Sequence, residues 1–140
     1  MIPSVCLGYL YTSMKNFLKY HLPFLAYAIL ILCVSSIPNL RTPQIRYFAF
    51  DKLAHLTEYA LFSLLCIRSL RHWMRKGHLS HAYLVTMAIL ILFALLDEWI
   101  QSYVPGRHSD KADYLTDILS GGGIVLIHWM FHRRRETVPK

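Results

Sequence analysis

Ionisable and amide side chains recur at helical spacing in three parts of the sequence. The groups are Asp51, His55 and Glu58, then Asp97 and Gln101, and then Asp113 and Asp117. Residues three or four positions apart share one face of an α-helix, so the first group would lie within about 60° of arc. These faces would combine into one site if the three helices were neighbours at the same depth.

The first chemistry that suits these side chains is general acid–base catalysis. The imidazole of His55 exchanges a proton near neutral pH, and Asp51, or an acid from a neighbouring helix, would orient the ring. The alternative is structural, with His55 buried and paired to a carboxylate only to hold the helices together. The sequence leaves both interpretations open, and Asp97 and Glu98 join His55 as candidate catalytic residues.

Metal binding is the second chemistry. Glu58, Asp97 and Asp117 are an oxygen-rich set, which suits Mg²⁺ or Mn²⁺ better than Zn²⁺. The order His55-x-x-Glu58, however, is the reverse of the Glu-x-x-His order of di-iron bundles. We therefore expect no resident cofactor, and keep a divalent cation at these carboxylates as an open alternative.

Arg107 is the best single candidate for binding an anion. It follows Pro105 and Gly106, a turn dipeptide, and its planar guanidinium matches phosphate or carboxylate groups. In a structural role it would fold back over the polar residues and pair with Glu98, Asp113 or Asp117. The sequence contains no G-x-S-x-G elbow, no Walker loop and no convincing nucleophile, so it does not decide whether the protein is an enzyme.

The composition indicates that a membrane surrounds these residues. Of the 140 residues, 55% are apolar and 16% are charged, against about 25% charged in an ordinary soluble domain. The mean hydropathy of the whole chain is +0.35. These values exclude a disordered chain, a coiled coil and a nucleic-acid-binding tail, despite the net charge of +7.

Four apolar stretches predict an all-α protein of one domain, an antiparallel bundle of four transmembrane helices. The expected helices cover about residues 20–38, 52–72, 81–104 and 113–132, between flanks at 1–19 and 133–140. A spanning helix needs about 20 mostly apolar residues, which only the third stretch supplies comfortably.

The lysines and arginines predict the orientation in the membrane. Ten of the 15 lie in the N-terminal flank, the second connection and the tail, namely Lys15, Lys19, Arg68, Arg71, Arg75, Lys76, Arg133, Arg134, Arg135 and Lys140. We therefore expect both termini in the cytoplasm. The second helix then enters from outside, the third leaves and the fourth returns, which places all three polar groups near the extracytoplasmic face.

The polar motifs, taken in order, resemble those of the VanZ-like membrane proteins. The motifs are Asp51-Lys52-x-x-His55-x-x-x-Tyr59, Asp97-Glu98-x-x-Gln101, Pro105-Gly106-Arg107, and a helix that carries Asp113, Asp117 and Gly121. The Ser-Ser-Ile-Pro run at 35–38 also matches, and the similarity covers about residues 22–130. Many members carry Asn where this chain has Asp117. The resemblance implies a small multi-pass membrane protein, in a family named after a member associated with teicoplanin resistance, and implies no settled reaction.

The sequence thus predicts a multi-pass protein of a bacterial cytoplasmic membrane that engages a lipid-linked or glycan-type ligand of the cell envelope. The expected ligand-binding residues are Asp51, Lys52, His55, Glu58, Tyr59, Asp97, Glu98, Gln101, Arg107, Asp113 and Asp117. The expected partners are membrane lipids and a lipid-linked precursor, without nucleic acid. A membrane hydrolase or transferase and a structural subunit without a ligand are the alternatives.

Overall fold

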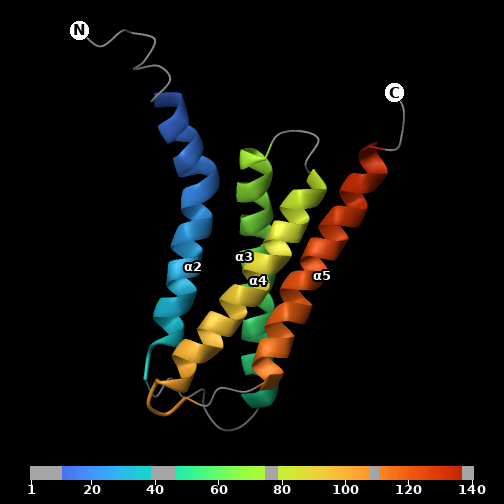
Figure 1. Cartoon of the computed structure of the whole chain (residues 1–140). Helices are drawn as coiled ribbons and strands as arrows, with labels where there is room; N and C mark the ends of the chain where they lie inside the picture. The colour runs from blue at the N-terminus through green and yellow to red at the C-terminus, as the bar shows by residue number, and fades with distance from the viewer. Residues whose placement is uncertain (1–10, 39–46, 75–78, 108–110, 137–140) are drawn as a thin grey trace, which may run out of the picture.

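The computed structural model describes residues 11–38, 47–74, 79–107 and 111–136, and these form an antiparallel helical bundle (Figure 1). A continuous helical segment at residues 11–35 contains a π-helical turn, η1 (Phe17–His21), and α2 (Leu22–Ser35). It is followed by α3 (Tyr47–Trp73), α4 (Leu79–Ser102) and α5 (Lys111–Glu136). The predicted all-α bundle of four helices is confirmed within the described residues.

The two ends of the bundle differ in chemistry. Ser35, Ser102 and the first turns of α3 and α5 lie together at one end, which we call the acidic end (Figure 1). Trp73, the start of α4 and the last turns of α5 lie at the other, which we call the basic end. The acidic end holds the three predicted polar groups.

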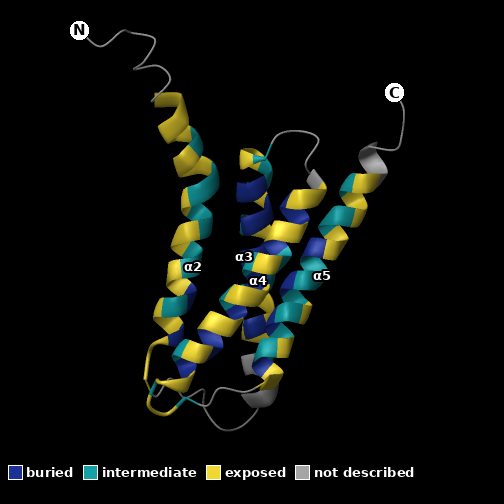
Figure 2. Ribbon diagram, in the orientation of Figure 1, coloured by how far each residue is buried: buried dark blue, intermediate teal, exposed yellow. Residues whose placement is uncertain are grey.

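The apolar exterior identifies a multi-pass membrane protein. The segments 11–35, 80–102 and 111–133 are long and apolar enough to cross a membrane. Leucine, isoleucine and phenylalanine side chains on their outer faces are exposed, as expected where lipid replaces water (Figure 2). Helix α3 is not among these segments, but its 27 residues are long enough to span a bilayer and it contacts each of the other helices.

The first helix begins earlier than the expected start near residue 20. Residues 11–16 are α-helical, and η1 leads directly into α2, which has Pro23 near its start. Proline lacks an N–H and its ring clashes with the carbonyl four residues earlier, here that of Lys19. The π turn accommodates Pro23 without breaking the helix, and Arg68 Nη2 donates to the carbonyl oxygen of Lys19 at 3.1 Å. The flank therefore continues the first helix.

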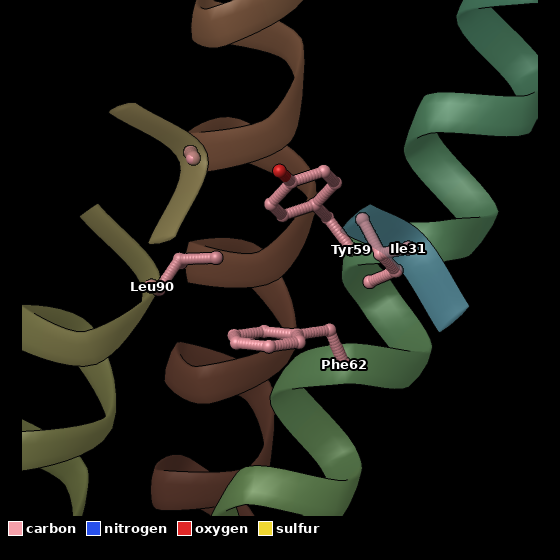
Figure 3. Packing of buried hydrophobic residues seen from close by; sticks show 5 residues of the cluster. Ile31, Tyr59, Phe62 and Leu90 are labelled. Carbon is pink, nitrogen blue, oxygen red and sulfur yellow. The ribbon is translucent and has the colours of Figure 1, made fainter. Parts of the chain in front are cut away.

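Aromatic and aliphatic side chains fill the centre of the bundle. Ile31, Tyr59, Phe62 and Leu90 converge there, each at most 1% exposed (Figure 3). Helix α5 approaches this core at Gly121, where an added Cβ would lie 2.5 Å from Ser63 Oγ. Lipid gives helices no hydrophobic reason to associate, so such van der Waals packing must hold them together.

Candidate functional site

Buried polar side chains form one layer at the acidic end. Asp117 is fully buried, Asp97 is 1% exposed and Gln101 is 3% exposed, while His55, Glu98 and Asp113 are each 8% exposed. An ionisable group inside a membrane span costs about 2.5–3.5 kcal/mol on insertion scales unless it finds partners. The hydrogen-bond and ion-pair partners of these side chains therefore determine whether the layer is a closed structural network or is able to bind a ligand.

Two pairs join α3 to α5. Lys52 Nζ forms an ion pair with Asp113 Oδ1, and His55 Nδ1 lies 2.9 Å from Asp117 Oδ1. Lys52 and His55 are three residues apart on one helix and Asp113 and Asp117 are four apart on the other, so the two pairs lie about one turn apart. The structure thus brings together four of the residues that the sequence singled out.

A second set of hydrogen bonds joins α3, α4 and α2. Tyr59 Oη and Gln101 Nε2 both donate to Asp97 Oδ2, each at 3.1 Å. Gln101 Nε2 also lies 3.4 Å from Ser35 Oγ at the end of α2. Asp97 is therefore held by donors from two helices, with one of its oxygens carrying both bonds.

Three buried atoms beside these pairs have no hydrogen-bond partner among the described residues. They are Asp97 Oδ1, Asp117 Oδ2 and Arg107 Nε. Each carboxylate therefore has one oxygen bonded to protein and one that is still able to accept a bond. Such atoms are costly when buried, at about 1–3 kcal/mol each, and a bound ligand or water would offset that cost.

Glu58 lies at the edge of the layer, on the side of α2. It is partly exposed and lines a groove of 520 Å³ between α2 and α3. The other lining residues are Tyr27, Leu30, Ile31, Val34, Leu53, Ala54 and Thr57. Because Glu58 also interacts electrostatically with His55, Asp97, Asp117 and Arg107, it connects the groove with the buried layer.

Arg107 does not meet the acids that the sequence suggested. Its Nη2 donates to the carbonyl oxygen of Val34 in α2 at 3.1 Å, while Asp113 and Asp117 pair with residues of α3. Gly106, at a φ of 79°, turns the chain before Arg107 in a conformation that glycine adopts without strain. The expected pairing of Arg107 with Asp113 or Asp117 is wrong, because Lys52 and His55 on the closely packed α3 already occupy these acids.

The described residues contain no group of three His, Cys, Asp or Glu side chains placed to hold a metal ion. Glu58, Asp97 and Asp117 are therefore not gathered as a ligand set, since Asp97 Oδ2 is turned toward Tyr59 and Gln101 and Asp117 Oδ1 toward His55. The side chain of Asp51 lies outside the described part of the chain. Glu98 is buried in the layer.

Sequence reasoning missed the contribution of α2. Ser35 hydrogen-bonds Gln101, the carbonyl of Val34 accepts from Arg107, and Tyr27 lines the groove beside Glu58. The Ser-Ser-Ile-Pro run at 35–38 was the one signal that marked this end of the helix. Backbone carbonyls and groove walls leave no such signal, because any residue type is able to supply them.

The sequence profile of the VanZ/LLP1 family matches residues 9–132, which is most of the chain. No curated protein and no solved structure matches the chain.

Proposed function

We propose, from the premise that this chain belongs to the VanZ/LLP1 family, that its polar layer binds a lipid-linked or glycan-type ligand of the cell envelope. One observation carries the proposal. Asp97 and Asp117 are buried and held by protein hydrogen bonds, yet each keeps one carboxylate oxygen without a partner among the described residues.

The open atoms suit the head group of such a ligand. An ionised carboxylate only accepts hydrogen bonds, so its natural partners are donors such as sugar hydroxyls. The Nε–H of Arg107 is a donor with no partner among the described residues, and a guanidinium binds phosphate through charge-assisted hydrogen bonds. A head group that combines hydroxyls with a phosphate would satisfy both kinds of atom.

The groove between α2 and α3 supports binding from the side of the membrane. Its walls are mostly apolar, and Glu58 is the acidic residue in its lining. A lipid-linked ligand could leave its hydrocarbon chain along α2 and α3 while its head group reaches Glu58 and the layer.

The orientation in the membrane belongs to the same proposal: both termini lie in the cytoplasm of a bacterium, and the acidic end faces outward. A contribution to glycopeptide resistance would follow from the family resemblance.

The bond between His55 and Asp117 favours one alternative, an acid–base hydrolase or transferase. A carboxylate 2.9 Å from Nδ1 holds the imidazole in one orientation, which is what a general base requires. If the wild type converts the bound ligand and His55→Gln does not, this alternative is established. If the wild type binds the ligand without converting it, the alternative is excluded for that ligand. A divalent cation shared between Asp97, Asp117 and a ligand phosphate stays a hypothesis, which binding with and without chelator would test.

The experiment measures binding to Asp97→Asn, which keeps the shape of the side chain and removes its charge. Purified full-length protein in detergent is titrated with a polyprenyl-pyrophosphate disaccharide, with polyprenyl phosphate and with an uncharged glycolipid, and the midpoint of thermal unfolding is followed. We expect the disaccharide to stabilise the wild type by about 2.7 kcal/mol at one hundred times its Kd.

The variant should bind at least about tenfold more weakly, a difference of about 1.4 kcal/mol. The matched control is Thr116→Ala, because Thr116 bonds the carbonyl of Ala112 in its own helix. If the wild type binds none of the three probes, or if Asp97→Asn binds like the control, the layer is a structural network and the proposal fails.

A further inference from the structure

A second groove lies between α4 and α5, nearer the basic end of the bundle. It has a volume of 620 Å³ and is lined by Ser80, Tyr83, Leu84, Met87, Ile118, Leu119, Gly122, Gly123, Val125, Leu126 and Trp129. Two glycines contribute to its depth, since a Cβ added at Gly123 would meet no atom within 4 Å. Leu84 and Leu119, at 68% and 74% exposed, project on either side. The groove is thus an apolar channel between protruding side chains.

Polar and cationic side chains gather at one end of this groove. Trp129 forms part of the lining, and the guanidinium of Arg133 lies 5.2 Å from the centre of its ring. Tyr83, also in the lining, lies with its Oη 3.0 Å from His128 Nδ1. Ser80 adds a hydroxyl on α4. We call Ser80, Tyr83, Trp129 and Arg133 the mouth of the groove.

The charge around the mouth extends onto α3. His128 stacks on His132 with a centroid distance of 4.9 Å, and His132 Nε2 contacts Arg71 Nη2. All described acidic side chains belong to the layer at the other end of the bundle, namely Glu58, Asp97, Glu98, Asp113 and Asp117. The described side chains thus place the arginines Arg71 and Arg133 at the basic end and the carboxylates at the other.

We propose that this groove is a binding site for an anionic phospholipid, with an acyl chain over Gly122 and Gly123 and the phosphate at Arg133 and Ser80. The occupant is argued from complementarity of charge and shape. The cation stands directly beyond an apolar channel, which is the arrangement of phosphate and acyl chain in a phospholipid. A single acyl chain is narrower than an α-helix, which is about 10 Å wide, so it would need less displacement of Leu84 and Leu119 to enter the groove.

This inference is independent of the proposed function, because the site lies on α4 and α5 at the end opposite the polar layer. It is tested through Trp129, one of three tryptophans in the chain. Trp73 and Trp99 are 75% and 58% exposed, so Trp73→Phe with Trp99→Phe leaves Trp129 as the sole reporter. The full chain is placed in phosphatidylcholine vesicles that contain brominated phosphatidylglycerol or, at the same mole fraction, brominated phosphatidylcholine, and the quenching of Trp129 is compared.

We expect brominated phosphatidylglycerol to quench Trp129 more strongly than brominated phosphatidylcholine does. One basic residue near the membrane surface should give about a fivefold preference for binding the anionic lipid at low salt. Arg133→Gln should abolish the preference and leave equal quenching by both lipids. The matched control is Lys15→Gln, which removes a charge from the first helical segment; among the described elements, η1 and α2, which continue that segment, make no contact with α5. Gly123→Leu places a side chain in the open space of the groove, and leucine is a better helix former than glycine, so the helix should be retained. Because the added side chain occupies the place of the acyl chain, this variant should reduce quenching by both lipids.

Several results would overturn the proposal. Equal quenching of the parent by both lipids would show that the groove does not select an anion. An equal loss of preference in Lys15→Gln and Arg133→Gln would assign the effect to the overall charge of the surface. A third result would be that neither brominated lipid quenches Trp129 while photobleaching counts two copies of the protein per vesicle. The groove would then be a contact between copies of this chain.

Discussion

Gly121 offers a direct test of the helix packing, because α5 lies close to side chains of both α3 and α4 there. A Cβ at this position would lie 2.5 Å from Ser63 Oγ and 2.7 and 2.9 Å from the two methyl carbons of Leu90. Carbon atoms in optimal contact are about 3.5–4.0 Å apart, so an alanine needs about 1 Å more room on both sides. Gly121→Ala should therefore push α5 away from the other two helices.

The packing around Gly121 determines the magnitude. Ser63 and Leu90 are both fully buried, and Leu90 packs in the core with Tyr59 and Phe62 (Figure 3), so any shift of these two side chains to make room must take place within the packed core. Overpacking of this kind costs typically about 1–3 kcal/mol. Since domains are stable by about 5–15 kcal/mol, this is a measurable share. Asp117 lies one turn before Gly121, so its bond to His55 should weaken as well.

The assay is the free energy of unfolding of the full-length protein, measured by titration with dodecyl sulfate in mixed micelles. The matched control is Gly123→Ala on the same helix, where the added Cβ meets nothing within 4 Å. We expect the control to be at least as stable as the wild type and up to about 1 kcal/mol more stable, because alanine is the better helix former. If Gly121→Ala is as stable as Gly123→Ala, α5 does not pack against Ser63 and Leu90 as described.

Three further predictions concern the polar layer and its orientation. Tyr59→Phe keeps the ring but removes the donor to Asp97, and should lower the free energy of unfolding by about 1–3 kcal/mol; an unchanged value would mean that this bond adds no net stability. Arg107→Lys keeps the charge but loses the planar guanidinium, and should weaken binding of a phosphate-bearing head group at least about tenfold; equal binding at equal abundance would return Arg107 to a structural role. Reporter fusions within residues 71–76 and after Lys140 should both report the cytoplasm; a periplasmic signal at either site would place the acidic end on the inner face instead.

The existence of the helices and their antiparallel order followed from the sequence for a simple reason. Hydropathy and helical spacing are properties of a single segment, and short connections force neighbouring segments to reverse direction. The same logic placed Lys52, His55, Asp97 and Asp117 at one depth, because the direction of each helix fixes which end its polar residues occupy. The sequence was therefore sufficient to bring these residues to one end of the bundle.

Their individual partners could not be predicted in this way. Whether Asp117 meets His55 or Arg107 depends on the rotation of α5 about its axis and on its distance from α3, and both are set by packing at Gly121 and in the core. Arg107 bonds a backbone carbonyl in α2, a partner that any residue at position 34 would offer. The early start of the first helix was missed because residues 1–19 were predicted to form a cytoplasmic flank, although the π turn lets the helix pass Pro23.

The position of α3 argues against a layer that serves packing alone. Helix α3 contacts all the other helices, and its polar residues reach Asp97 on α4 and Asp113 and Asp117 on α5. A network that only tied helices together would be cheapest if every buried polar atom had a protein partner. Here Asp97 Oδ1 and Asp117 Oδ2 lack one among the described residues, and Glu58, which interacts electrostatically with both acids, lines the groove between α2 and α3. The carboxylates are thus fixed in position by one oxygen and left able to accept a bond with the other, and this open oxygen is the feature on which the proposed binding of a hydroxyl-bearing head group rests.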